Sequence, residues 1–186
     1  MKLNKISVLD KGFVSLMSTS NDEKMLKSIQ EEYYNSATYK QLSDIATATF
    51  IVKCPIFVQL FLASRPEFSF TILSTPSSEL EAYVPDESEI GAKPGESLAI
   101  RKNMQATTAA LLINPKAFQH DGCDRFISQV LTPISVYSEL IVHGNLSNWV
   151  KFLSKTSLPK SIEPYRAAIE TFLRSMWTNL DDYMVK

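Results

Sequence analysis

The chain has 186 residues, of which 45% are hydrophobic and 21% are charged, and its formal net charge at pH 7 is −1. These values predict one globular domain over residues 1–186, because a single core serves chains of roughly 100–200 residues. A nearly neutral chain lacks the long-range field that holds nucleic acid or an anionic membrane, so we expect neither partner. No apolar run is long enough for a signal peptide or a membrane span, so we expect a cytoplasmic protein.

The residues that most often bind metals are few and scattered. Cys54, Cys123, His120 and His143 show no metal-ligand spacing, so no metal site is predicted. Each cysteine is expected to be a reduced thiol rather than half of a disulfide.

The first half of the chain predicts short strands and helices. The predicted elements are a β-hairpin over residues 2–9 and 12–17, a helix capped by Ser20 or Asn21, a strand over 47–53, a helix over 56–64 and a strand over 68–73. Pro55 suits the first position of the helix that follows the strand over 47–53, because a missing N–H costs nothing there. The helix after Pro55 is almost wholly apolar, so we expect it to be buried on most sides.

The second half predicts more helix than strand. An exposed loop is expected over residues 74–97, which are rich in Ser, Pro, Glu and Gly. The elements expected after it are a helix from Ser97 to about residue 113 that buries Leu98, Met104, Leu111 and Leu112, a helix over 124–131, a strand over 136–143, a helix capped by Asn145, a helix over 162–177 and a tail helix over 179–185. The predicted fold class is α+β, a small sheet packed with several helices.

Three segments, in this order, resemble the flavin-dependent thymidylate synthases. KISVLDKGFVSL at residues 5–16 is similar to that family's first hairpin, and TFIVKCPIFV at 49–58 is similar to the strand and helix start before its signature. NLSNWVKFL at 145–153 is similar to a later helix, and Tyr83-Val84-Pro85 matches a tyrosine-isoleucine-proline step. The resemblance implies the family's fold.

The resemblance also implies a function and partners. Members of the family are homotetramers that bind FAD and dUMP at subunit interfaces, and they methylate uracil carbon 5 with a flavin hydride. Their signature is Arg-His-Arg, then a serine, and then a stretch ending in Glu, Ser and Arg. Arginines hold phosphates through bidentate hydrogen bonds and stabilise negative charge on the uracil carbonyls.

The chain departs from this signature at most of its charged positions. The Arg-His-Arg triplet falls on Ser64, Arg65 and Pro66, and the two signature serines fall on Ser69 and Ser74. The other charged positions hold Ile72, Pro76, Ser128 and Thr156. By motif position the candidate cofactor-binding residues are therefore Arg65, Ser69 and Ser74, and no catalytic residue is assigned. The alternatives are an ordinary arginine at a helix end and ordinary turn or strand serines.

Two hypotheses follow from the resemblance. The first is a non-catalytic homologue that serves as an assembly or interaction subunit, because losing nearly all the arginines removes normal phosphate and uracil binding. The second is an active FAD-dependent enzyme that acts on a pyrimidine nucleotide with an altered site. The expected partners are further copies of the chain in a tetramer, or a catalytic paralogue in a mixed oligomer.

Overall fold

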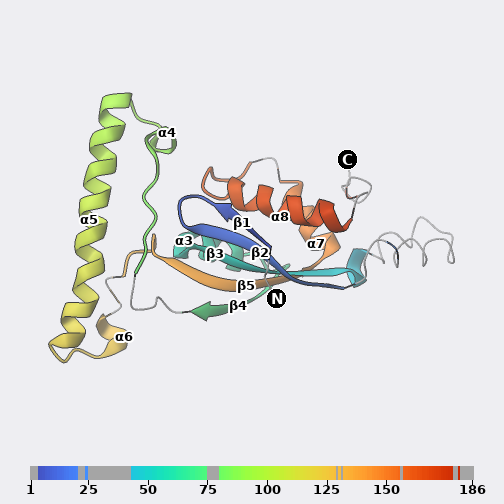
Figure 1. Ribbon diagram of the computed structural model, residues 1–186, viewed down its shortest axis with the longest axis horizontal. Helices are drawn as coiled ribbons and strands as arrows, with labels where there is room; N and C mark the ends of the chain where they lie inside the picture. The colour runs from blue at the N-terminus through green and yellow to red at the C-terminus, as the bar shows by residue number, and fades with distance from the viewer. Residues whose placement is uncertain are drawn as a thin grey trace.

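The computed structural model describes residues 4–20, 24, 43–74, 80–128, 130, 132–155, 157–177 and 180 (Figure 1). The helix predicted after Ser20 and the tail helix predicted over 179–185 lie almost wholly outside these residues. Ser20 itself ends a strand, where its Oγ lies 2.7 Å from Thr47 Oγ1.

One antiparallel sheet forms the centre of the described chain. Its strands are β1 (Lys5–Val8), β2 (Gly12–Ser20), β3 (Thr47–Pro55), β4 (Ser69–Ser74) and β5 (Tyr137–Asn145), in the order β1-β2-β3-β5-β4. The predicted hairpin and the three later strands are confirmed, and β2 and β3 are longer than expected. Pro55 is still paired with Tyr137, so it ends β3, and it is also the N-cap of the helix that begins at Ile56, one position before the place predicted for it.

Six helices are described around this sheet. They are α3 (Ile56–Ala63), α4 (Glu87–Ile90), α5 (Pro94–His120), α6 (Arg125–Ser128), α7 (Leu146–Leu153) and α8 (Glu163–Met176). The cap predicted for α7 is confirmed, because Asn145 Oδ1 accepts a hydrogen bond from the Asn148 N–H at 2.9 Å. The α+β class is therefore confirmed. No helix in the described part of the chain is long and apolar enough to span a bilayer.

The core lies between the sheet and the helices drawn above it in Figure 1, α7 and α8. Trp149 of α7 is fully buried, and its Nε1 donates to the carbonyls of Ala48 and Gly144 at 3.2 and 3.1 Å. The rings of Phe50 and Phe68 pack on it, with centroids 5.1 and 4.3 Å away. Such a buried aromatic cluster makes the end of the sheet near α7 rigid, since truncating a buried Trp or Phe costs about 3–5 kcal/mol.

Helix α3 is buried on most sides, as predicted. Val58 and Leu62 belong to the core, and Leu60, which is 59% exposed, is the one exposed residue of this helix. The apolar helix therefore leaves a single side open to solvent.

The predicted loop over residues 74–97 contains ordered structure. Ala82 forms an isolated β-bridge with Val136, Tyr83 is only 7% exposed, and α4 follows with a capping box between Asp86 and Glu89. The expectation of an exposed loop is therefore wrong for this part of the segment.

Helix α5 differs most from the prediction. It begins at Pro94, so Ser97 lies in its first turn rather than at its cap, and it continues to His120. Its main contacts with other elements are with α4 and α6, and Figure 1 shows it standing apart from the sheet. Leu98 and Met104, which we expected to be buried, are 42% and 41% exposed. A helix of this length, about 40 Å, therefore forms an arm with apolar side chains in solvent.

Candidate functional site

The first two candidate residues lie in the turn between α3 and β4 and directly after it. The turn is fixed by backbone hydrogen bonds from Arg65 N–H to the Leu62 carbonyl (3.1 Å) and from Phe68 N–H to the Arg65 carbonyl (3.2 Å). Ser69 then starts β4. The short sequence separation and this tight turn keep Arg65 and Ser69 in one region of the molecule.

Arg65 stacks on its own helix. Its guanidinium carbon lies 4.6 Å from the centroid of the Phe61 ring, and its buried Nε has no hydrogen-bond acceptor among the described residues. It does not donate to the last carbonyls of α3, as an ordinary helix-end arginine does. An arginine held against a ring with an unsatisfied Nε retains the capacity to bind an anion.

Ser69 belongs to a polar row across four strands. Ser18, Thr49, His143 and Ser69 are successive partners in the sheet register, so their side chains leave the same face. Thr49 Oγ1 lies 2.8 Å from His143 Nδ1, and His143 is exposed. With Nδ1 engaged by Thr49, the Nε2 of His143 faces outward as a donor or an acceptor, depending on the tautomer.

Spacing along the chain indicated no role for His143. Its partner is the hydroxyl of Thr49, 94 residues away, and only the pairing of β3 with β5 brings the two together. The alternation of Thr49 within its strand was visible, but the register that sets it opposite His143 was not.

Ser74 lies at the far end of β4, opposite Glu139. It lies five positions along the strand from Ser69, a distance of about 16 Å. A single phosphate group cannot contact both serines. The structure brings Arg65 and Ser69 into one region and leaves Ser74 outside it.

The signature positions without charge have structural roles of their own. Ser64 Oγ donates to the Phe61 carbonyl at 2.8 Å, and Ile72 is 58% exposed on the edge strand. Ser128 is buried and accepts a hydrogen bond from Gln119 Nε2 at 2.8 Å. Pro66 lies in the turn after Arg65, while Pro76 and Thr156 lie outside the described residues.

A second polar cluster lies at the opposite end of β3. Lys53 Nζ lies 2.5 Å from Glu81 Oε2, and Tyr137 Oη donates to Asp10 Oδ1 at 2.5 Å. The hydrogen bond from Lys53 lowers the pKa of the Glu81 carboxyl, and burial followed by the bond to Asp10 raises the pKa of Tyr137. Because these groups satisfy one another, they hold the segment before α4 against the β1–β2 loop.

The described residues contain no group of three or more His, Cys, Asp or Glu side chains close enough to hold a metal ion. Burial raises the pKa of the Cys54 thiol, so the thiolate that reacts and binds metals does not form there.

Comparisons with known proteins identify the fold. No protein-family model matches this chain, and no curated protein matches it. A structure of the UMP/dUMP methylase PolB from Streptomyces cacaoi bound with 5-Br dUMP matches with a TM-score of 0.75 and 18% identity, over 96% of both chains. The same methylase bound with 5-Br UMP matches with a TM-score of 0.74 and 15% identity, again over 96% of both chains. This chain therefore shares the fold of those chains over nearly its whole length.

Proposed function

We propose that this chain is a cytoplasmic, non-catalytic relative of the flavin-dependent thymidylate synthases that acts as an assembly or interaction subunit. The observation that carries the proposal is a contrast. The fold matches that of a UMP/dUMP methylase over 96% of the chain, whereas Ser64, Pro66 and Ile72 stand where the family resemblance places charged residues. We infer that a chain which keeps this fold but lacks the charged residues of the signature serves a purpose other than the family's reaction.

The residues present do not fit an FAD diphosphate on their own. Arg65 is the single cation of the turn between α3 and β4, and its neighbours are a serine bonded to its own helix and a proline without an N–H. A hydrogen bond to a charged group contributes about 1.5–3 kcal/mol, so losing several of them lowers phosphate affinity by orders of magnitude. The same loss applies to the phosphate of dUMP.

The exposed side chains of the arm support an assembly role. Five large apolar residues of α5 are each at least 40% exposed, namely Leu98, Ile100, Met104, Ile113 and Phe118. A 27-residue helix with this surface and few contacts to its own sheet is stabilised when another subunit covers it. We propose that further copies of this chain cover it, in the tetramer that the resemblance implies.

Two measurements on the purified protein test this proposal. We expect a colourless protein that sediments as a tetramer and gives no heat with dUMP or FAD in calorimetry. Ile113→Glu is expected to dissociate the tetramer, because Ile113 is 67% exposed and a charge there is costly in an interface. Lys151→Glu on α7, also an exposed position, is the matched control and should remain tetrameric. A yellow protein that releases flavin on denaturation contradicts the proposal. A parent protein that is a monomer, or a tetramer that Ile113→Glu leaves intact, contradicts it too.

A second candidate is an active enzyme on a pyrimidine nucleotide. It is favoured by the unsatisfied Nε of Arg65 and by the row that contains Ser69 and His143, which together offer donors to a nucleotide. The PolB chains of the same fold hold 5-Br dUMP and 5-Br UMP. Release of the uracil carbon-5 hydrogen from dUMP, lost in Arg65→Met, establishes this candidate. The assay is repeated after co-expression with an intact paralogue, because a partner subunit in a mixed oligomer can supply arginines.

A further inference from the structure

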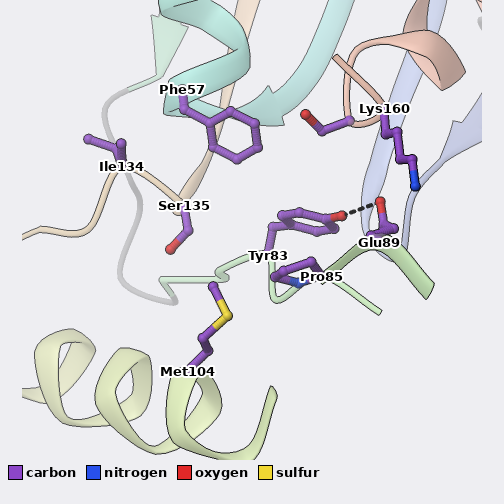
Figure 2. Close-up of a pocket in the computed structure, with 9 residues that line it drawn as sticks. Phe57, Tyr83, Pro85, Glu89, Met104, Ile134, Ser135 and Lys160 are labelled. Carbon is purple, nitrogen blue, oxygen red and sulfur yellow. Dashed lines mark hydrogen bonds between the residues drawn. The ribbon is translucent and has the colours of Figure 1, made fainter. Parts of the chain in front are cut away.

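A pocket of about 520 Å³ lies between the α5 arm and the body of the molecule (Figure 2). Arg65 and Ser69 are not among its lining residues. Phe57 comes from the first turn of α3, Tyr83 from the segment before α4, Met104 from α5 and Ile134 from the segment before β5. Four separate elements therefore converge on one cavity.

Most of the wall is apolar and aromatic. The rings of Phe57 and Tyr83 are 6.1 Å apart and inclined by 43°, and Pro85 extends the same surface. Met104 and Ile134 face these rings across the pocket in Figure 2. A cavity with aromatic groups on one side and flexible aliphatic groups on the other accepts a flat ring, and its volume lies within the range of sites for small molecules.

The pocket positions of the two rings are fixed before any ligand binds. Tyr83 N–H donates to the Ser135 carbonyl and Phe57 N–H donates to the Ile134 carbonyl, each at 2.9 Å. The hydroxyl of Tyr83 donates to Glu89 Oε1 at 2.7 Å. Because the aromatic wall is preorganised, binding loses little side-chain entropy.

Opposite charges stand at one end of the pocket. Figure 2 shows the ammonium of Lys160 and the carboxylate of Glu89 at that end. Glu89 accepts from Tyr83 Oη and from Asp86 N–H, yet a carboxylate has about four acceptor positions and so retains two. Lys160 is exposed and forms no salt bridge among the described residues, so its three donors face solvent. This end offers one donor and one acceptor with no net charge.

We propose that this pocket binds a small, neutral, planar heteroaromatic molecule whose edge carries an N–H next to a C=O. The ring lies between Phe57 and Tyr83 on one side and Met104 and Ile134 on the other. The C=O of the ligand accepts from Lys160, and its N–H donates to Glu89. Because Met104 belongs to α5, the ligand also ties the arm to the body. The proposal does not depend on the proposed function, because the only residue that the two share is Met104.

The first test uses calorimetry with 2-quinolinone, which carries the N–H and C=O edge, and with N-methyl-2-quinolinone, which has no N–H. We expect saturable binding of 2-quinolinone and about tenfold weaker binding of N-methyl-2-quinolinone, because the methyl group removes the donor to Glu89. Lys160→Met should weaken 2-quinolinone about tenfold, and Lys151→Met on α7 should leave it unchanged. Equal binding of 2-quinolinone and its N-methyl derivative overturns the proposal, as does the absence of saturable binding at millimolar 2-quinolinone.

The second test fills the pocket from either wall. Met104 and Ile134 are 41% and 60% exposed, so a tryptophan is tolerated at each position. Met104→Trp and Ile134→Trp should each abolish binding, with folding checked by circular dichroism, whereas Phe70→Trp on β4, where Phe70 is 45% exposed, should bind as the parent does. If either folded pocket variant binds 2-quinolinone as tightly as the parent, the ligand lies elsewhere and the proposal is wrong.

Discussion

Gly12, the first residue of β2, is predicted to tolerate no side chain. A Cβ at this position would lie 2.4 Å from the hydroxyl of Tyr165, 2.7 Å from the Val8 carbonyl and 2.8 Å from the Lys53 carbonyl. Val8 is the strand partner of Gly12, and Lys53 is paired with the next residue, Phe13. Since two of the three contacts are to backbone held in the sheet, they cannot be relieved by a side-chain rotation.

The cost of Gly12→Ala follows from these contacts. Overpacking a well-packed site costs about 1–3 kcal/mol, and we expect a value near the upper end because the sheet backbone must shift. For a chain of this size that corresponds to a melting temperature lower by roughly 6–12 °C. Tyr165→Phe alone should cost about 1 kcal/mol or less, because the hydroxyl makes only a 3.4 Å hydrogen bond to the Lys53 carbonyl.

Urea unfolding, followed by the fluorescence of the buried Trp149 and Trp177, measures these values. In the double variant the nearest contact is gone, so Gly12→Ala should cost about 1 kcal/mol less in the Tyr165→Phe background than in the parent. Gly95→Ala is the matched control: a Cβ there meets no atom within 4 Å, and it should be neutral or stabilising by up to about 1 kcal/mol. A cost for Gly12→Ala below about 0.5 kcal/mol, or one independent of Tyr165, refutes this reasoning.

Three further predictions concern stability. Asn145→Ala should lower the free energy of unfolding by about 1 kcal/mol in urea titrations, because the N-cap acceptor of α7 is lost; an unchanged value would contradict the cap. Burial raises the pKa of Tyr165, so the folded state holds that proton more tightly than the unfolded state does. Stability should therefore be constant below the unfolded pKa near 10 and fall above it, by up to about 1.4 kcal/mol per pH unit for this group, and Tyr165→Phe should reduce the slope measured between pH 9 and 11. Glu81→Gln should cost less than about 1 kcal/mol at pH 7, since the Glu81 side chain is 39% exposed and partly screened. Because Lys53 lowers the pKa of Glu81, the difference between Glu81→Gln and the parent should disappear as the pH falls through that lowered pKa; a difference that persists in acid refutes the ion pair as its cause.

Local chemistry in the sequence was enough to find most of the sheet and its adjoining helices. The alternation of Thr47 to Lys53, the turn after Val8 and the Asn145 cap each depend on neighbouring residues, so a linear pattern carries them. The end of β3 at Pro55 was missed by two residues, because β5 continues to pair with the strand beyond the point where the pattern stops.

Two larger errors arose from burial. Helical spacing of Leu98 and Met104 predicted a helix correctly but said nothing of what would cover its apolar face. Tyr83 was assigned to an exposed loop because its neighbours are polar and acidic, whereas the Phe57 ring and the backbone of Ser135 enclose it. Apolar periodicity indicates which face of a helix would be stabilised by burial. Whether another part of the same chain covers that face is determined only by the tertiary packing.

For the candidate site, too, some features follow from the sequence and others only from the tertiary structure. Sequence alone determined that Arg65 and Ser69 lie four residues apart near a helix end, and that the other positions of the implied signature lack charge. Tertiary structure decided that Arg65 stacks on Phe61, that Ser69 joins His143 and Thr49, and that Ser74 lies about 16 Å away. Strand register depends on segments that are distant in the sequence. The pocket beside Tyr83 likewise needs four separate elements to come together. Spacing along the chain specifies local chemistry, whereas which side chains meet is set by how the whole core packs.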